Sequence, residues 1–313
     1  MLEDLNSKCA IGIDVGGTKI AAGIVTQGGK LLFSRRQPTI AERGGEAVLR
    51  DVETISDELI AQAEASGLKV GGIGISLAEL VDLHGNVTSE QTIKWCGWPV
   101  RERLSRIAPT VIESDVRAAA LAEAIHGAGR DYRIFLYLTV GSGISCSLVQ
   151  HKLPYTGAFG NALVCASSPL TSNCSTCGTT NRMILEEYAS GPALARRYQS
   201  FRAEKILRAE QVIDAAFAGD AQAIEILQSA GAALGVTAGL LVNVLDPEAV
   251  IVGGGLGLID GFYWESFLAS TREHIWAEAG RGLPIGHAVL AENGVIGAAM
   301  CIWRDSEHPN QGG

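Results

Sequence analysis

The sequence predicts an α/β protein of two domains that are built on one repeated plan. Its 313 residues are too many for one ordinary hydrophobic core, and 47% hydrophobic residues with 38 glycines suit strands and helices joined by tight turns. An apolar strand runs into the turn Asp14-Val15-Gly16-Gly17-Thr18, and Thr139-Val140-Gly141-Ser142-Gly143 repeats that pattern after another apolar strand. Two such blocks indicate an internal duplication.

The first block alternates strands and helices. Residues 10–33 predict two strands joined by a glycine turn, with a second turn at Gly28-Gly29. Residues 49–65 have helical periodicity, and residues 70–76 predict a short buried strand that is followed by a loop up to Trp98. A strand that ends at Ile112 then leads into an alanine-rich helix closed by Gly127.

The second block begins in the same way. Residues 135–155 predict a strand, a glycine turn, a second strand and a hairpin. After a loop-rich section, residues 215–245 predict a long helical region that is interrupted near Gly219-Asp220. Residues 249–257 predict a strand ending in three glycines, and residues 294–304 predict a helix that folds back at the C-terminal end.

Charge and composition limit the partners of the protein. The formal net charge is −9 and no run of lysine or arginine stands out, so we expect no nucleic-acid partner. The first ten residues are too polar for a signal peptide, and no apolar run reaches the roughly 18 residues of a membrane span, which predicts a soluble cytoplasmic protein without a membrane partner. Seven cysteines, an odd number, fit reduced thiols better than a disulfide framework.

Three glycine turns, at residues 16–17, 141–143 and 253–255, each follow a predicted buried strand. Consecutive backbone N–H groups in such turns converge on phosphate oxygens, because glycine has no Cβ and tolerates a positive φ. One turn of this kind is more often an ordinary hairpin, whereas three of them favour a phosphate-binding site.

Two aspartates follow predicted strands. Asp14 either holds Mg²⁺ through water beside phosphates or forms an Asx turn. Asp115 begins a helix, where it is either a helix cap, a role that Ser114 fills as well, or a base that accepts a proton from a hydroxyl attacking a γ-phosphate. Spacing alone leaves both alternatives open for each residue.

The order and spacing of five motifs resemble the ROK family of repressors and sugar kinases. The motifs are Asp14 to Lys19, Ser114-Asp115, Leu138 to Gly143, Glu186-x-x-x-Ser190-Gly191, and Asn243-x-x-Asp246-Pro247 leading to Gly253-Gly254-Gly255. The resemblance implies an actin-like ATPase fold, which is ribonuclease-H-like, with duplicated mixed sheets, ATP in an interdomain cleft, and a homodimer. We expect an N-terminal α/β domain of residues 1–115, joined by a C-terminal helix at 295–313, and a C-terminal α/β domain of residues 116–294.

The resemblance also implies roles for single residues. Asp115 falls on the family's catalytic base, and Asp14 would position Mg²⁺. The nucleotide-binding positions fall on the three glycine turns, at Gly16, Gly17, Thr18 and Lys19, at Thr139, Gly141, Ser142 and Gly143, and at Gly253, Gly254 and Gly255. With ATP and Mg²⁺ as cofactors, the implied chemistry is phosphoryl transfer to a sugar hydroxyl.

The substrate and zinc motifs depart from the family pattern. The family has Glu-Ile-Gly-His before its cysteines, and here Val164 takes the place of the glutamate and Ser167 that of the histidine. The family's three-cysteine motif is reduced to Cys174-x-x-Cys177. Because a structural zinc takes four ligands, we expect no tightly bound Zn²⁺ unless Cys165 is recruited, and the alternative is a turn with two free thiols.

Other positions around the implied sugar site differ as well. Ser114 stands where the family commonly has asparagine, Glu79 lies where it has a Pro-Gly turn, and Lys94 replaces another asparagine. Glu186 keeps its sugar-contacting identity, and Ser167 is a candidate contact at the position of the lost histidine. Glu79 and Lys94 either read a different acceptor or pair with each other.

The sequence therefore predicts an ATP-dependent kinase of a sugar or sugar-like polyol, such as a hexose, amino sugar, N-acyl sugar or cyclitol. The alternative is a non-catalytic sugar or nucleotide sensor of the same fold, that is, a pseudokinase. About ten residues precede the first glycine turn, far short of a repressor's DNA-binding domain. Retention of Asp14, Asp115 and the glycine turns favours the kinase.

Overall fold

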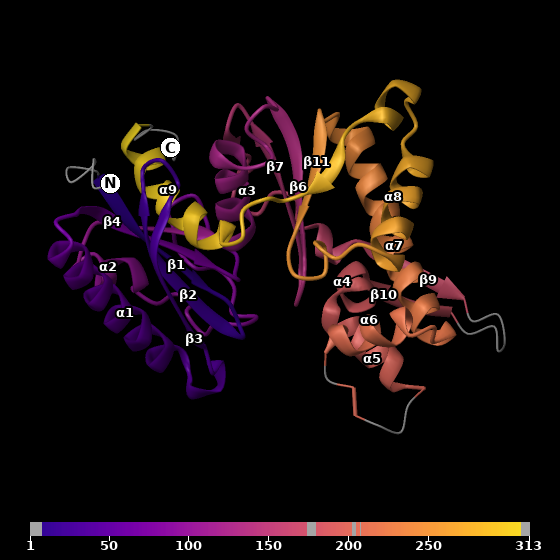
Figure 1. Ribbon diagram of the computed structural model, residues 1–313, viewed down its shortest axis with the longest axis horizontal. Helices are drawn as coiled ribbons and strands as arrows, with labels where there is room; N and C mark the ends of the chain where they lie inside the picture. Colours follow the sequence, from indigo (N-terminus) through magenta and orange to yellow (C-terminus); the bar gives the residue numbers. More distant parts are fainter. Residues whose placement is uncertain (1–7, 174–179, 202–204, 207, 308–313) are drawn as a thin grey trace. The chain divides into compact units, whose positions relative to one another are not determined.

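Figure 1 shows the computed structural model, which describes residues 8–173, 180–201, 205–206 and 208–307. The chain forms two compact units: residues 1–131, 149–162 and 289–313 make up unit 1, and residues 132–148 and 163–288 make up unit 2. This division differs from the expected one, because the helix that begins at Asp115 packs within unit 1 rather than opening the second domain.

Unit 1 contains a five-stranded sheet in the order β3-β2-β1-β4-β5. β1 (Lys8–Val15), β2 (Lys19–Thr26) and β3 (Leu31–Pro38) form an antiparallel meander, whereas β4 (Lys69–Leu77) and β5 (Thr110–Ser114) run parallel to β1. The carboxyl ends of β1, β4 and β5 therefore lie at one edge of the sheet. Asp14 and Ser114 both lie at that edge.

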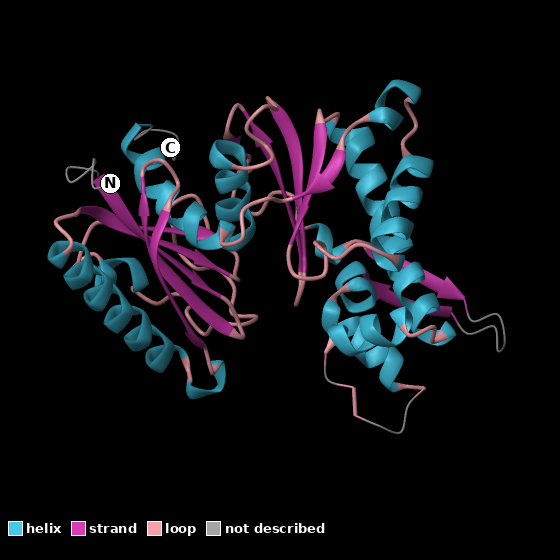
Figure 2. Ribbon diagram, in the orientation of Figure 1, coloured by secondary structure: helices cyan, strands magenta, loops and turns pink. Residues whose placement is uncertain are grey.

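Helices cover both faces of this sheet, as Figure 2 shows. Ile11 and Ile13 of β1 pack in one core with α1 (Gly45–Ala65) and α2 (Val100–Leu104). Ala10 points to the opposite face and packs with α3 (Asp115–His126) and α9 (Asn293–Glu307). A Cβ on Gly12 would collide with the carbonyl oxygen of Val295, so glycine lets α9 lie directly on β1. A short 3₁₀ helix, η1 (Ala41–Arg43), precedes α1.

The second sheet repeats this plan in the order β12-β11-β6-β7-β8. β6 (Ile134–Val140), β7 (Ile144–Gln150) and β8 (Leu153–Pro154) correspond to β1, β2 and β3, and β11 (Ala249–Gly253) and β12 (Ile285–His287) correspond to β4 and β5. β11 runs parallel to β6 and β12, while β7 pairs antiparallel with β8, which is grouped with unit 1. The shared strand order confirms the predicted duplication.

The rest of unit 2 is mostly helical. One core joins α4 (Leu185–Ala189), α5 (Gly191–Gln199), α6 (Ala209–Phe217), α7 (Ala221–Leu245) and α8 (Phe262–His274). The predicted break at Gly219-Asp220 separates α6 from α7, because the Asp220 carboxylate caps α7 by accepting hydrogen bonds from the N–H groups of Gln222 and Ala223.

Three features of unit 2 were not predicted. The loop-rich section contains η2 (Cys165–Ser167) and a hairpin of β9 (Pro169–Asn173) and β10 (Thr180–Ile184), followed by α4 and α5. The segment after β11 contains α8, η3 (Glu278–Gly282) and β12. α7 is long and apolar enough to span a membrane, so the expectation that no segment has this property is wrong for α7, although half of its most apolar window is buried inside the protein, as in a core helix.

Candidate active site

Asp14 lies at the carboxyl edge of the unit 1 sheet, beside Ser76 of β4. The Ser76 hydroxyl donates a 2.5 Å hydrogen bond to the Asp14 carboxylate. A Cβ on Gly294, in the first turn of α9, would lie 2.8 Å from the Asp14 carboxyl carbon. The carboxylate therefore sits near the N-terminal turn of a 15-residue helix, whose partial positive charge favours an anion. Burial raises the pKa of Asp14, and the hydrogen bond from Ser76 and the charge of Lys19 oppose the rise.

The first glycine turn, residues 16–18, joins β1 to β2 and is anchored by Thr39. The Gly16 N–H donates to the Lys19 carbonyl at 3.0 Å, and the Thr39 hydroxyl donates to the Gly16 carbonyl at 2.6 Å. The Thr39 N–H also donates to the Thr18 carbonyl at 3.1 Å. Gly17, Thr18 and Lys19 are exposed. The turn is therefore fixed and accessible, as a phosphate-binding turn must be.

Asp115 begins α3 directly after β5. One of its carboxylate oxygens accepts a 2.7 Å hydrogen bond from the Val116 N–H. Ser114 occupies the cap position, yet its side chain makes no capping hydrogen bond, and its buried hydroxyl has no partner among the described residues. The structure contradicts a capping role for the Ser114 side chain. Buried hydroxyls are normally hydrogen-bonded, so this unpaired hydroxyl beside Asp115 is a candidate ligand contact.

The surroundings of Asp115 suit a base. Burial raises the pKa of Asp115 to about 7; the negative charges of Asp14 and Glu79 add to the rise, while the Val116 N–H and the charge of Arg117 oppose it. A pKa near neutrality gives a carboxylate both a substantial ionised fraction and a strong affinity for a proton. The structure thus brings the two predicted aspartates into one electrostatic environment.

Glu79 is buried and braces the loop of residues 89–93. Its carboxylate accepts hydrogen bonds from four groups of this loop, namely the Ser89 hydroxyl and the N–H groups of Gln91, Thr92 and Ile93. The Thr92 side chain in turn lies against Gly17, where a Cβ would collide with it. Glu79 therefore supports the first glycine turn through this loop. Sequence reasoning missed this role.

Lys94 lies at the end of the same loop and is exposed. Its ammonium group donates to the Glu90 carbonyl at 3.3 Å. The carboxylate of Glu79 is directed to backbone N–H groups instead, so the ion pair considered for Glu79 and Lys94 is not formed in the described part of the chain. Lys94 is free of any strong structural role and remains a predicted substrate contact.

In unit 2, the second and third glycine turns meet at the carboxyl ends of β6 and β11, which are parallel neighbours. The Val140 carbonyl accepts hydrogen bonds from the N–H groups of Leu256 and Gly257, both at 3.0 Å. Gly254 has a φ of 84°, and a Cβ there would lie 2.7 Å from the Thr139 hydroxyl oxygen and collide with the Val140 carbonyl. The structure therefore groups the predicted unit 2 residues Thr139, Gly141, Gly253, Gly254 and Gly255.

Glu186 of α4 braces the turn of Gly141, Ser142 and Gly143. Its carboxylate accepts a 2.8 Å hydrogen bond from the Ile144 N–H, and a Cβ on Gly143 would lie 2.7 Å from a Glu186 carboxylate oxygen. Gly191 adds a second tie, because its N–H donates to the Gly141 carbonyl at 2.8 Å. Gly191 belongs to the Glu186-x-x-x-Ser190-Gly191 motif, but the sequence analysis assigned it no role in the site.

The predicted zinc ligands are only partly described. Cys174 and Cys177 lie outside the described residues, so the zinc site stays a prediction. Cys165 is buried in the unit 2 core together with Cys146, whose thiol donates to the Leu163 carbonyl at 3.1 Å. Within the described ranges, no three histidine, cysteine, aspartate or glutamate side chains are grouped to hold a metal ion.

Ser167 lies in η2 and is exposed. Its hydroxyl donates to the Val164 carbonyl at 2.9 Å, and the Val164 side chain is also exposed. Both positions are therefore accessible to a ligand, and Ser167 stays a predicted contact.

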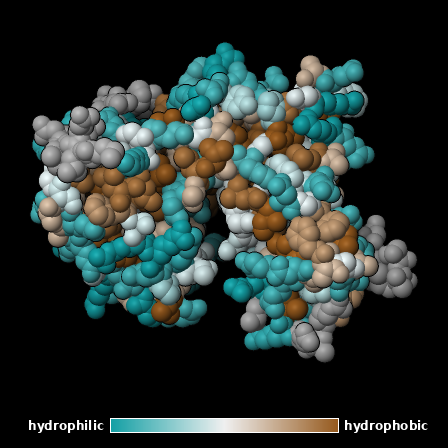
Figure 3. Space-filling view, viewed as in Figure 1, coloured by the Kyte–Doolittle hydropathy of each residue, from teal (hydrophilic) through white to brown (hydrophobic). Residues whose placement is uncertain are grey.

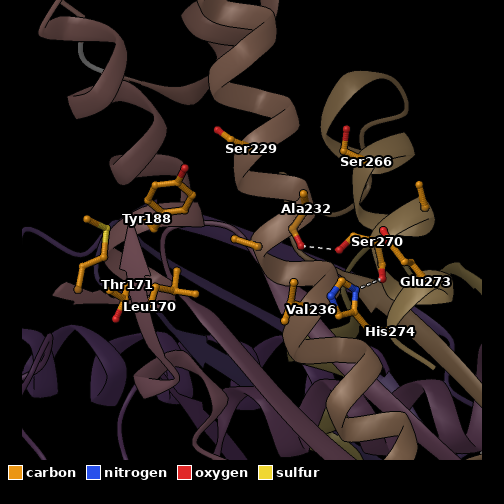
Figure 4. A pocket seen from close by; sticks show the side chains of 13 residues that line it. Leu170, Thr171, Tyr188, Ser229, Ala232, Val236, Ser266, Ser270, Glu273 and His274 are labelled. Atoms are coloured by element: carbon orange, nitrogen blue, oxygen red, sulfur yellow. Dashed lines mark hydrogen bonds between the residues drawn. The ribbon is translucent and has the colours of Figure 1, made fainter. Parts of the chain in front are cut away.

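A cavity of about 550 Å³ in unit 2 contains none of the predicted site residues. Figure 4 shows it between Leu170, Thr171 and Tyr188 on one side and Ser266, Ser270, Glu273 and His274 of α8 on the other, with Ser229, Ala232 and Val236 of α7 between them. Two of its polar groups are bonded within the protein: the Ser270 hydroxyl donates to the Ala232 carbonyl, and the His274 Nδ1 is paired with the Ser270 carbonyl, both at 2.8 Å. This cavity is distinct from the glycine turns.

Comparison with known proteins gives one consistent result. The model of the ROK family matches residues 10–305. A glucokinase of Streptomyces coelicolor is 29% identical, over 92% of this chain and 96% of its own length, and an N-acetylmannosamine kinase of Vibrio vulnificus is 30% identical, over 80% and 84%. The crystal structure of a Streptomyces griseus ROK glucokinase with glucose and AMPPNP superposes with a TM-score of 0.79 at 26% identity, covering 95% of this chain and 99% of that one.

Proposed function

The chain belongs to the ROK family, and from this premise we propose that Asp115 is the general base of an ATP-dependent sugar kinase. The observation that carries the proposal is the half-buried Asp115 carboxylate, with a pKa of about 7, next to the unpaired hydroxyl of Ser114. Two relatives named above are kinases of a hexose and of an N-acyl amino sugar. The similarity to these relatives supports ATP-dependent phosphorylation of a sugar hydroxyl as the activity of this chain.

The proposed chemistry follows from the positions of these groups. Asp115 accepts the proton of the acceptor hydroxyl, the hydroxyl oxygen forms a bond to the γ-phosphorus of ATP, and the bond from that phosphorus to the bridging oxygen breaks to release ADP. The N–H groups of Gly16 and Gly141 are bonded to the carbonyls of Lys19 and Gly143. Other N–H groups of the glycine turns, at residues 17–18, 142–143 and 254–255, donate to phosphate oxygens.

Mg²⁺ is the expected partner of the nucleotide. Asp14 fits a water-mediated role, because it is a carboxylate at the edge where the first glycine turn begins, and Mg²⁺ in nucleotide sites is held by one or two carboxylates and the phosphates. The ion, when bound, neutralises charge on the phosphates.

Coupled detection of ADP over a panel of hexoses, amino sugars, N-acyl sugars and cyclitols tests the proposed function. A kinase releases ADP in proportion to a phosphorylated product. A sensor of the same fold binds sugar or nucleotide without acceptor-dependent ADP release, and that result would replace the proposal.

The left-handed backbone of Leu163, with a φ of 62°, supports a second register for the Glu-Ile-Gly-His segment. Glycine is the residue that adopts this conformation most easily, and Leu163 is the one residue of 161–168 that adopts it. With Leu163 at the glycine position, Asn161 replaces the glutamate and Val164 replaces the histidine. In either register the acid and the imidazole are both absent.

Ser114→Ala is expected to raise the acceptor KM about tenfold, because one hydrogen bond to a ligand is worth about 0.5 to 1.5 kcal/mol. The kcat, the ATP KM and the melting temperature should stay close to wild type, because the hydroxyl has no described partner within the protein. Steady-state kinetics and thermal unfolding measure these quantities. Ser76→Ala is the matched control, since its hydroxyl is bonded to Asp14 and its loss should affect nucleotide use. An unchanged acceptor KM in Ser114→Ala would remove Ser114 from the acceptor site.

We propose that the protein acts as a homodimer in the cytoplasm and has no nucleic-acid partner. α7 exposes the apolar row Val236, Leu240 and Val244. The side chain of Trp276 is 89% exposed, and its backbone N–H donates to the Asn243 side-chain oxygen at 2.8 Å. Figure 3 shows apolar surface over the region of α7 and the β9–β10 hairpin. In a two-fold dimer, each copy would present the exposed Trp276 and the unit 2 cavity to the other copy. A net charge of −9 and Glu273 at the cavity disfavour binding of this surface to an anionic membrane. The mass of the protein in solution tests this.

A further inference from the structure

Arg117 is an arginine of α3, two residues after Asp115, and only 7% of it is exposed. Its guanidinium group has partners on three segments of unit 1. Nε donates to the Glu113 carboxylate at 2.6 Å, Nη2 donates to the Val81 carbonyl at 2.8 Å, and Nη1 donates to the Gly160 carbonyl. Arg117 therefore joins the end of β5, the segment after β4 and the segment of residues 155–162.

The last two of these segments lie in direct contact. Gly160 has a φ of 77°, and a Cβ there would lie 2.5 Å from the Val81 carbonyl oxygen and 2.8 Å from the Asp82 Cα. The guanidinium binds one carbonyl from each segment at this junction. Asn161, which follows the bound carbonyl, is exposed, so the junction carries an accessible amide side chain.

Arg117 has two roles: it pairs with the Glu113 carboxylate, and it binds the Val81 and Gly160 carbonyls. The second cationic partner of Glu113 allows these roles to be separated. Glu113 accepts a second charge-assisted hydrogen bond, at 2.9 Å, from Arg304 of α9. Loss of Arg117 therefore leaves the buried Glu113 carboxylate with one cationic partner, whereas the Val81 and Gly160 carbonyls lose the donor that holds them together. We therefore expect the loss of Arg117 to disturb the contact between the segment after β4 and residues 155–162, rather than the whole of unit 1.

We propose that Arg117 is a positioning residue for the sugar acceptor: by binding the Val81 and Gly160 carbonyls it fixes the wall of the acceptor site beside Asp115. The proposal rests on the proposed role of Asp115. The planar guanidinium, with donors in a fixed fork, can bind a carboxylate and two carbonyls at once, which the single ammonium of lysine cannot do in the same geometry. The charge of Arg117 also opposes the rise in the pKa of Asp115.

The test compares Arg117→Lys and Arg117→Met with wild type. Both are expected to raise the acceptor KM at least about tenfold and to lower kcat, because displacement of a positioning group by about 1 Å costs up to a hundredfold, while the ATP KM stays within about twofold. If the acceptor KM of Arg117→Lys is raised as much as that of Arg117→Met, the planar guanidinium with its several donors is needed, and a positive charge alone is not enough. Gly160→Ala forces the same two segments apart without altering the guanidinium, and the same rise in acceptor KM is expected for it.

Arg103→Met is the matched control. Arg103 of α2 also bonds two carboxylates, with Glu53 at 2.8 Å and Glu46 at 2.7 Å, but these ties join α2 to α1. Its variant is expected to lose stability without a change in acceptor KM. An acceptor KM within twofold of wild type in Arg117→Met, or an equal rise in the ATP KM, overturns the inference. Failure of the proposed function is distinguishable, since it would appear as normal turnover by Asp115→Asn.

Discussion

Asp115→Asn is expected to lower kcat by at least about a hundredfold while the Kd for ATP stays nearly unchanged, because general base catalysis contributes about 10²- to 10⁴-fold and the amide cannot accept the hydroxyl proton. The carboxylate bonds only the adjacent Val116 N–H among the hydrogen bonds described for it, and an amide oxygen can keep that bond. Steady-state kinetics and equilibrium ATP binding measure the two effects separately.

The same substitution carries a stability signature. The pKa of Asp115 is raised to about 7 in the folded state, so the carboxyl group favours folding below its unfolded pKa and that contribution is lost as pH rises through about 7. Asp115→Asn should therefore melt at a higher temperature than wild type at pH 8, and the gain should shrink towards pH 4. Asp131→Asn, at an exposed carboxylate, serves as the control. Near-normal turnover in Asp115→Asn would reduce Asp115 to the first residue of a helix.

Glucose is expected to be phosphorylated with a kcat/KM at least about a hundredfold below that of the preferred acceptor. Each lost hydrogen bond to a charged group costs about 1.5 to 3 kcal/mol, and both the acid and the imidazole of the family segment are replaced here. The replacements are Val164 with Ser167 in one register and Asn161 with Val164 in the other, so the expectation does not depend on the register. Competition of glucose against the best acceptor of the panel measures the ratio.

Glucose turnover with a sub-millimolar KM would contradict this expectation and require a compensating group. Glu79 does not suit this role, because its carboxylate is occupied by the N–H groups of Gln91, Thr92 and Ile93. Lys94 and the unpaired hydroxyl of Ser114 would then be the next residues to replace. N-acyl sugars are a contrasting class, because an apolar Val164 suits an acyl group better than a hydroxyl.

The strands, the glycine turns and the helix at Asp115 could be predicted because each is encoded locally, in runs of apolar residues that end at glycine. The contacts that build the site are not local. Gly294 approaches Asp14 from 280 positions along the chain, and the partners of Glu79 are backbone N–H groups whose direction no side-chain pattern records. Spacing could not decide whether Ser114 is a cap, since that depends on where its hydroxyl points.

The dependence of kcat/KM on pH tests the assignment of Asp115 most directly. With a preferred acceptor, log kcat/KM is expected to rise with a slope of one up to an apparent pKa of about 7 and then to level off, because the base must be ionised in the free enzyme. A rate that is flat from pH 5 to pH 8, or that reaches its plateau near the ordinary aspartate pKa of about 4, would contradict the assignment.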